Sequence, residues 1–178
     1  RSTYRMNARG FPIDRKSAFK LRDLVASTRA RMSADTLAEH GFTLTQVKDV
    51  AAFLGLPGVA KNVIRDYLKN PHLPEKYRKV ALARQAFAKT SVDKIKAMLA
   101  RSGVDGSVHD GVIYGAAERT LRFAGAGVQP QNLPRGMGDK QNLIFDAIEI
   151  DGCFEVLFYG EELPTIADVI RGLIRRDF

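Results

Sequence analysis

The chain has 178 residues, of which 45% are hydrophobic, and it carries a formal net charge of +8 at pH 7. Its one cysteine excludes an internal disulfide, and no apolar run approaches the roughly 20 residues that a membrane span needs. Residues 1–10 lack the apolar segment of a signal peptide and do not begin with methionine. We therefore expect a cytoplasmic protein, and we expect this chain to be a piece of a longer one.

Positive charge is concentrated in the first part of the chain. Residues 1–100 hold 20 Lys and Arg against 8 Asp and Glu, whereas residues 101–178 hold 8 against 12. A basic half of this kind points to a polyanionic partner, most often nucleic acid. A solvated, lysine-rich surface on a helical protein would give the same totals, so charge alone leaves both interpretations open.

Helical periodicity dominates the basic half. Asp14 suits the N-cap of a helix predicted over residues 15–40. Thr43 or Thr45 would cap a shorter helix over residues 47–54, which the following glycine and proline would end.

The longest predicted helix runs from residue 75 to residue 101, with one apolar stripe and most of its lysines and arginines outside that stripe. Residues 107–117 alternate enough to predict a strand or a hairpin. A short extended segment and four further helices are expected over residues 8–14, 59–69, 139–149, 152–159 and 165–175, in that order. The expected fold class is mainly α with a small β element.

Motifs of the common catalytic and metal sites are missing from the sequence: there is no Walker-type glycine loop, CxxC, HExxH or GxSxG. The three histidines lie far apart and are expected at helix ends or on the surface. Asp146, Glu149 and Asp151 cluster loosely and could hold Mg²⁺, although a solvated helix end explains them as well. We therefore predict no catalytic residue and no metal site in this chain.

Residues 125–136 read GAGVQPQNLPRG, a composition that neither a core strand nor a helix tolerates. We expect an ordered loop or a run of turns here. Its side chains are mostly hydrogen-bond donors, namely Gln129, Gln131, Asn132, Arg135 and, just upstream, Arg122.

Such a loop is chemically suited to duplex DNA that is read without regard to sequence. In the minor groove every base pair presents acceptors at similar places, so a protein that must accept any sequence needs neutral donors there. Lysines on a neighbouring helix would bind phosphates and supply affinity that depends on salt. A polar surface loop whose amides cap backbone groups is the alternative, and the chemistry leaves the two open.

The stretch TLRFAGAGVQPQNLPRG, residues 120–136, resembles a segment of family A DNA polymerases, in which Thr-Gly-Arg is followed by Gln-Asn-(Leu/Ile)-Pro. Arg122 and the pair Gln131–Asn132 stand at the family's spacing, and Leu121 stands where the family has glycine. The phage and prophage branch often carries the form GRGVQPQNLPRG. Three further segments are similar to the family in order and spacing: MNARGFPID at 6–14, FTLTQVKDVAAFLG at 42–55 and ALARQAFAKTSVDKIKAML at 81–99.

The resemblance implies a helical thumb over residues 1–101, which grips primer–template duplex, and the start of the palm over residues 102–178. Arg122 would reach the minor groove at the primer terminus, and Gln131 and Asn132 would contact the terminal base pairs or the template strand. The full set that the resemblance places at DNA is Arg84, Lys89, Ser91, Lys94, Thr120, Arg122, Gln129, Gln131, Asn132 and Arg135.

The resemblance also implies a full-length parent that is a DNA-directed DNA polymerase of the bacterial cytoplasm, encoded by a phage or prophage. That enzyme would use Mg²⁺ and deoxynucleoside triphosphates in DNA replication. This chain stops at RGLIRRDF, before the family's catalytic aspartates, so alone it is predicted inactive, and its incomplete palm is open to non-native self-association. Two alternatives stay open: a stand-alone helical DNA-binding protein and a basic protein–protein adaptor.

Overall fold

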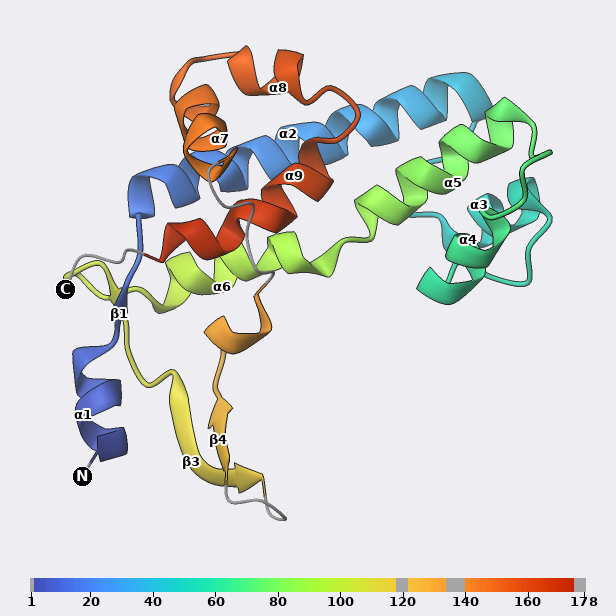
Figure 1. The fold of residues 1–178 in the computed structure, drawn as a ribbon. Coiled ribbons are helices and arrows are strands. Elements are labelled where there is room, and N and C mark those ends of the chain that lie inside the picture. Colours follow the sequence, from blue (N-terminus) through green and yellow to red (C-terminus); the bar gives the residue numbers. More distant parts are fainter. Residues whose placement is uncertain (1, 118–121, 134–139, 175–178) are drawn as a thin grey trace. The chain divides into compact units, whose positions relative to one another are not determined.

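The computed structural model describes residues 2–117, 122–133 and 140–174. Helices dominate this part of the chain, and its strands form two antiparallel sheets of two strands each (Figure 1). The expected fold class, mainly α with a small β element, is confirmed. None of the described helices combines the length and the apolar character that crossing a membrane requires.

The chain divides into two compact units. The first unit comprises Arg1–Leu24 and Thr90–Phe178, and the second comprises Val25–Lys89. One helix, α2 (Arg15–His40), passes from the first unit into the second. This division describes how the backbone packs and does not test function. The boundary expected between a thumb-like region and a palm segment, at residues 101 and 102, therefore stays a prediction.

The second unit is built from the last part of α2 and three shorter helices, α3 (Val47–Leu54), α4 (Lys61–Tyr67) and α5 (Glu75–Phe87). Aromatic rings crowd its core, with centroids 4.8–5.8 Å apart between neighbours. Tilted aromatic pairs at this separation add to the stabilisation that comes from burial. The buried residues of this core are Phe42, Val50, Leu54, Ile64, Val80 and Ala81, and the rings in contact are His40, Phe42, Phe53 and Tyr77.

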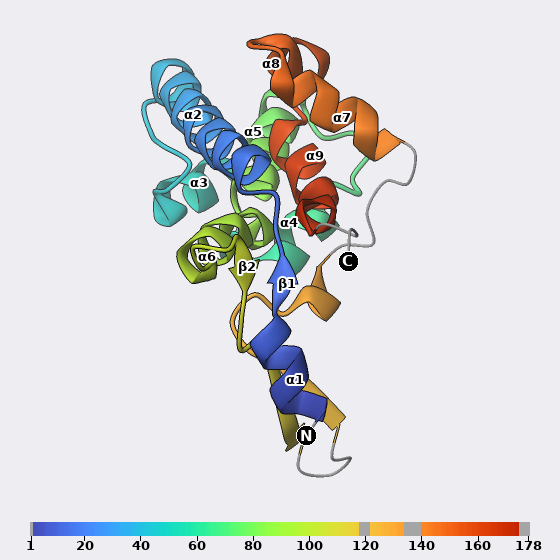
Figure 2. The same ribbon diagram turned by 90° about the vertical axis from the view of Figure 1, so that its left-hand side faces the viewer.

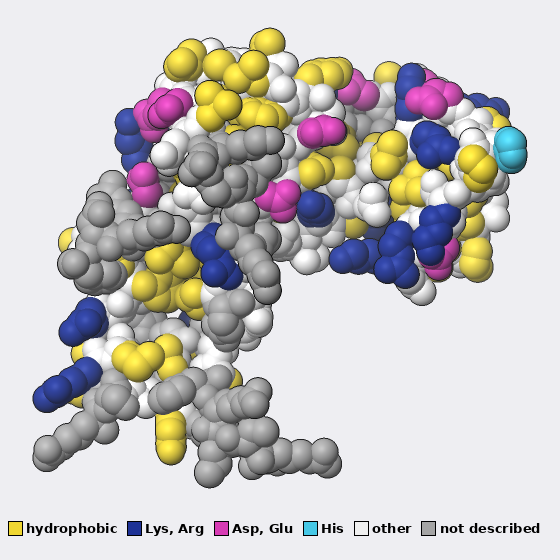
Figure 3. All heavy atoms as spheres, in the orientation of Figure 1, with side chains coloured by type: hydrophobic (Ala, Val, Ile, Leu, Met, Phe, Trp, Pro, Cys, Tyr) yellow, Lys and Arg dark blue, Asp and Glu magenta, His cyan; other side chains and the backbone are white. Residues whose placement is uncertain are grey.

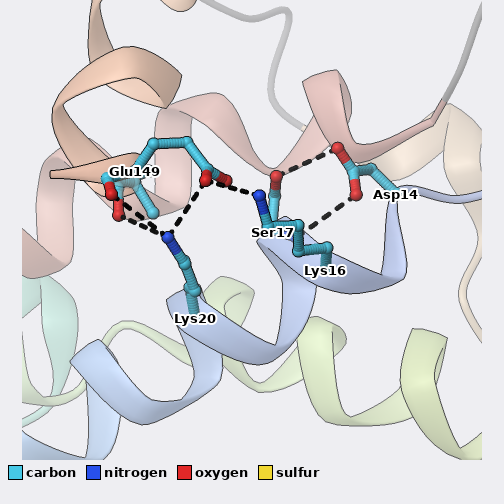
Figure 4. Close-up of polar contacts among 6 residues, drawn as sticks. Asp14, Lys16, Ser17, Lys20 and Glu149 are labelled. Carbon is cyan, nitrogen blue, oxygen red and sulfur yellow. Dashed lines mark hydrogen bonds and ion pairs between the residues drawn. The ribbon is translucent and has the colours of Figure 1, made fainter.

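Asp14 caps the start of α2, as predicted. Its Oδ1 accepts a hydrogen bond from the Ser17 backbone N–H at 3.2 Å, and its Oδ2 accepts one from the Ser17 hydroxyl at 2.9 Å (Figure 4). The cap satisfies one of the backbone donors that every helix start leaves without an intrahelical partner. The predicted cap of α3 by Thr43 or Thr45 is wrong, because Gln46 occupies the N-cap position and its Oε1 accepts a hydrogen bond from the Thr43 N–H at 2.6 Å.

The single long helix predicted over residues 75–101 is also wrong. After α5, a 3₁₀ turn, η1, occupies Thr90–Asp93, and α6 then spans Lys94–Arg101. The Thr-Ser-Val run inside η1 consists of weak helix formers. In addition, the Arg29 guanidinium donates a hydrogen bond to the carbonyl of Phe87 at 3.4 Å, which gives the end of α5 a donor that a continuing helix would have supplied.

The first unit packs short helices around an apolar core. Ile95 and Met98 of α6 are fully buried in it, as are Leu163, Ile166 and Ile170 from the C-terminal part of the chain. The helix predicted over residues 165–175 begins earlier, at Glu162, and ends as a 3₁₀ turn. The strand at Arg122–Gly125, β4, was not predicted. The elements of this unit besides α2, η1 and α6 are α1 (Ser2–Arg9), β1 (Phe11–Pro12), β2 (Ser107–Val108), β3 (Val112–Ala117), β4 (Arg122–Gly125), η2 (Pro130–Asn132), α7 (Lys140–Glu149), α8 (Cys153–Leu157), α9 (Glu162–Val169) and η3 (Ile170–Leu173).

Asn7 fastens α1 to the hairpin of β3 and β4, against which that helix lies (Figure 2). The Asn7 Nδ2 donates to the Val112 carbonyl at 2.8 Å, and the Val112 N–H donates to the Asn7 Oδ1 at 3.0 Å. The side-chain amide thus pairs with the strand backbone as a neighbouring strand would. One polar side chain therefore links residues that are 105 positions apart in the sequence.

His109 lies beside this junction. Its Nε2 is 2.9 Å from the Asp105 Oδ2, and its Nδ1 is 3.3 Å from the carbonyl oxygen of Asn7. The hydrogen bond to Asp105 raises the pKa of the His109 imidazole, and the carbonyl of Asn7 adds to the effect. The same carboxylate has a lowered pKa because it accepts hydrogen bonds from the Ser107 backbone and from His109.

Replacement of Asp14 by alanine should lower the free energy of unfolding by about 1 kcal/mol, because the N-cap acceptor of α2 is lost. Asp14→Asn keeps an acceptor and should retain most of the stability. Urea unfolding followed by circular dichroism measures both. Asp23→Ala is the control, since Asp23 lies on the same helix and pairs with its neighbour Arg22. Equal losses in the alanine variants would contradict the capping role.

The pairing with Asp105 should give His109 a pKa above its ordinary value of about 6.5 in an NMR titration. Because the folded-state pKa is the higher one, the stabilisation is fully present below pH 6.5 and is lost as the pH rises through the folded-state pKa. Asp105→Asn should return the pKa of His109 toward its ordinary value. Asp110→Asn, which changes a neighbouring carboxylate, should shift the pKa of His109 less. If Asp110→Asn shifted that pKa more than Asp105→Asn does, Asp105 would be excluded as the partner of His109.

Candidate nucleic-acid interface

The segment of residues 126–133, named here the glutamine loop, is an ordered turn. Val128 and Leu133 are buried, with 1% and 4% of their surfaces exposed, and they anchor the loop at both sides of η2. Inside it, the Asn132 N–H donates to the Gln129 carbonyl at 3.0 Å, and the Leu133 N–H donates to the Pro130 carbonyl at 3.2 Å. The loop therefore presents its polar side chains from a fixed backbone.

Gln129 adopts a left-handed backbone conformation, with φ at 50° and ψ at 71°. A residue with a side chain pays roughly 1–2 kcal/mol for this conformation. The Asn132 Nδ2 donates to the Gln129 Oε1 at 2.7 Å, and this hydrogen bond offsets part of the cost. Strained backbone of this kind is concentrated at functional sites, where the surrounding structure holds it in place.

Gly127 allows an arginine to approach the loop backbone closely. Its φ is 63°, and a Cβ at this position would overlap the guanidinium of Arg101, at the end of α6. Any side chain at position 127 would therefore displace that guanidinium as well as strain the backbone.

Two further cations reach the backbone carbonyls of the glutamine loop. The Lys94 Nζ of α6 donates to the Asn132 carbonyl at 3.4 Å. The Arg171 Nη2 of η3 donates to the Leu133 carbonyl at 2.7 Å and to the Pro130 carbonyl at 3.4 Å. Together with Arg101, these side chains give the loop a positive environment, which favours a polyanionic ligand.

The side-chain amides of the loop retain hydrogen-bond donors. The contact between Gln129 and Asn132 uses one acceptor of Gln129 and one N–H of Asn132. Among the described residues, the Gln129 Nε2 has no hydrogen-bond partner, and Asn132 is exposed to solvent. The alternative expectation was a loop whose amides bond only within the protein, and this one contact agrees with it in part. The two side chains still keep N–H groups that could donate to a ligand.

The structure describes only some of the predicted DNA-binding residues. Thr120 and Arg135 lie outside the described residues. Arg122 begins β4 and Gln131 lies in η2, but the side chains of both lie outside the described part. Lys94, Gln129 and Asn132 are brought together, as the contacts above show.

Arg84, Lys89 and Ser91 were expected to share one continuous helix with Lys94, and that premise fails because the helix is broken. Arg84 lies in α5 of the second unit and is half-buried. Its Nε is buried without a hydrogen-bond partner in the described part of the chain, and burial lowers the pKa of its guanidinium. Lys89 and Ser91 are half-buried on either side of the boundary between the two units.

Sequence reasoning missed Arg101 and Arg171. Arg101 was seen only as the end of a helix, and Arg171 only as part of a C-terminal helix. No spacing signal could have found Arg171, because 38 and 41 positions separate it from its two carbonyl partners. The neighbouring Gly127 is the one local hint for Arg101, since glycine often marks a close approach to backbone.

Basic side chains also gather on the second unit, over the region of α4 and α5 (Figure 3). Lys61, Arg65, Lys69 and Lys76 are exposed there. Asp66 pairs with Lys69 at 2.7 Å, which lowers the pKa of that carboxyl. Exposed cations of this kind would contribute affinity for phosphates that salt weakens.

Of the acidic residues near the end of α7, Glu149 is paired with two lysines. The Glu149 Oε2 lies 2.6 Å from the Lys16 Nζ and 3.1 Å from the Lys20 Nζ, both on α2 (Figure 4). The hydrogen bonds from Lys16 and Lys20 lower the pKa of Glu149. Within the described ranges, no group of three or more His, Cys, Asp or Glu side chains is arranged to hold a metal ion.

The chain is similar to a DNA polymerase of Bacillus phage SP02. The two are 32% identical over 126 residues, which cover 66% of this chain and 18% of that polymerase. No protein-family model and no solved structure matches the chain. The chain thus spans less than a fifth of the polymerase that it resembles, and the similarity supports a relationship to DNA polymerases.

Proposed function

We propose that this chain is the thumb and the start of the palm of a family A DNA polymerase of phage or prophage type, and that it binds primer–template duplex. The observation that carries the proposal is the glutamine loop, a fixed turn with spare amide donors in a cationic environment. The similarity to a phage DNA polymerase supports the same conclusion.

The chemistry of the loop fits the minor groove of a duplex. Purine N3 and pyrimidine O2 accept hydrogen bonds at similar positions in every base pair, so the amides of Gln129 and Asn132 can donate to any sequence. The left-handed backbone at Gln129 and the buried anchors keep these amides in one arrangement. Little conformational entropy would then be lost when the duplex binds.

The other expected DNA contacts complete this proposal. Arg122 and Gln131 would join the amides in the minor groove, with Thr120 and Arg135 beside them. Arg84, Lys89 and Ser91 would lie toward the sugar–phosphate backbone. Contacts of this second kind fix the register of a protein on the duplex and carry no sequence information.

For the longer protein we propose template-directed DNA synthesis from deoxynucleoside triphosphates with Mg²⁺. In that reaction paired carboxylates hold the metal ions that stabilise the attacking and leaving oxygens. Glu149 does not suit this task, because two lysines already neutralise it. We therefore assign no step of phosphoryl transfer to the residues of this chain, whose proposed role is to hold the duplex.

Asn132→Asp tests the loop, because it keeps the shape of the side chain and replaces its N–H donors by acceptors. Affinity for primer–template duplex should fall about tenfold or more, since acceptors would then face acceptors. Fluorescence titration with labelled duplex, against single-stranded DNA of equal length and across a salt series, measures this. The slope of log affinity against log salt should stay nearly unchanged, because no phosphate-binding cation is removed.

Asn142→Asp on α7 is the matched control. It makes the same change of charge at an exposed asparagine of the first unit. It should weaken duplex binding far less than Asn132→Asp does. Equal effects of the two variants, or a parent chain without preference for duplex, would exclude groove reading by the loop.

A further inference from the structure

Arg171 occupies a rigid position next to the glutamine loop. It lies in η3 directly after Ile170, and both Ile170 and Leu173 are fully buried. At Gly172, a Cβ would overlap the side chains of Gln141 and Phe145 of α7, so η3 packs closely on that helix. The backbone that carries Arg171 is therefore fixed by the core.

The guanidinium of Arg171 joins the two ends of η2. Its Nη2 donates to the Leu133 carbonyl at 2.7 Å and to the Pro130 carbonyl at 3.4 Å. Pro130 begins the turn, and Leu133 follows its last residue. A charged donor at 2.7 Å makes a stronger hydrogen bond than a neutral one, and a donor shared between both carbonyls fixes the distance between them.

The loop needs such a donor from outside. It contains Pro130, and a proline lacks the N–H that could donate a further backbone hydrogen bond. The Leu133 carbonyl lies at a buried residue, where an acceptor without a partner is costly.

We infer that Arg171 is a positioning residue, which holds the glutamine loop in its binding shape before any ligand is present. This inference deepens the proposed function and rests on it only for the identity of the ligand. Arg171 acts through the carbonyls of Pro130 and Leu133, and these in turn fix the backbone that carries Gln129 and Asn132. Without the guanidinium, the loop would open, and its amides would lose their common orientation.

Hydrogen exchange of individual amides in this chain, followed by NMR, tests the inference without DNA. In Arg171→Met the N–H groups of Asn132 and Leu133 should exchange about tenfold faster, because the turn that protects them loses a charged hydrogen bond. Arg171→Lys keeps a charged donor and should restore most of the protection. Arg15→Met is the matched control, because Arg15 also donates to a backbone carbonyl of the first unit, that of Gly103 at 3.0 Å.

Duplex titration of the same variants provides the second measurement. Arg171→Met should weaken duplex binding about tenfold, and the salt slope should fall by no more than about one, because a single positive charge is removed. Arg15→Met should leave both exchange at the loop and duplex binding near those of the parent. Unchanged exchange at Asn132 and Leu133 in a folded Arg171→Met variant would overturn the inference.

Should Arg171→Met fail to fold, Arg171→Gln decides, because it keeps a polar side chain but loses the charge and the length of the guanidinium. Faster exchange confined to the amides of the glutamine loop supports the positioning role, whereas no change there, or a uniform change through α9 and η3, overturns it. A parent chain that does not prefer duplex would refute the proposed function alone. The exchange rates of the Asn132 and Leu133 amides would still test the positioning role of Arg171, because that measurement contains no DNA.

Discussion

The hydrogen-bonding demand of the glutamine loop is the constraint on which the candidate site depends. Gly127 and Pro130 keep it out of an α-helix or a sheet. Within the loop, backbone N–H groups reach the carbonyls of Gln129 and Pro130, and the carbonyls of Asn132 and Leu133 find donors elsewhere. Arg171 and Lys94 supply these donors from η3 and α6, two elements whose backbones are set by the core of the first unit. The loop is thus shaped by residues distant in sequence, and the arrangement of its amides follows from that shape.

The break between α5 and α6 has a comparable cause. A continuous helix over residues 75–101 would have carried Arg84, Lys89 and Lys94 on one axis, with about 140° of rotation from each to the next. Instead, Arg29 caps the end of α5, and Lys94 opens a new helix within the other unit. Lys94 can then reach the Asn132 carbonyl. A residue that was expected to bind phosphate thereby becomes part of the support of the loop as well.

Local signals in the sequence predicted the elements that depend on local physics. The extent of α2, its cap by Asp14 and the irregular nature of the glutamine loop all follow from periodicity, capping chemistry and turn composition. Long-range pairs could not be found in this way. The amide of Asn7 meets Val112 across 105 positions, and Arg171 meets Leu133 across 38, because the whole fold brings them together. The weak helix formers in η1 were visible in the sequence, but the apolar stripe that continues through them outweighed that signal.

The cations around the loop have a consequence beyond support. A carbonyl that accepts a hydrogen bond is a dipole and leaves the formal charge of its donor in place. In the described part of the chain, no ion pair neutralises Lys94 or Arg101. Their charges therefore raise the potential at a surface whose outward groups are the neutral amides of Gln129 and Asn132. Long-range attraction to a polyanion and sequence-tolerant hydrogen bonding are then supplied by different residues, so the first can be weakened by salt while the second keeps its geometry.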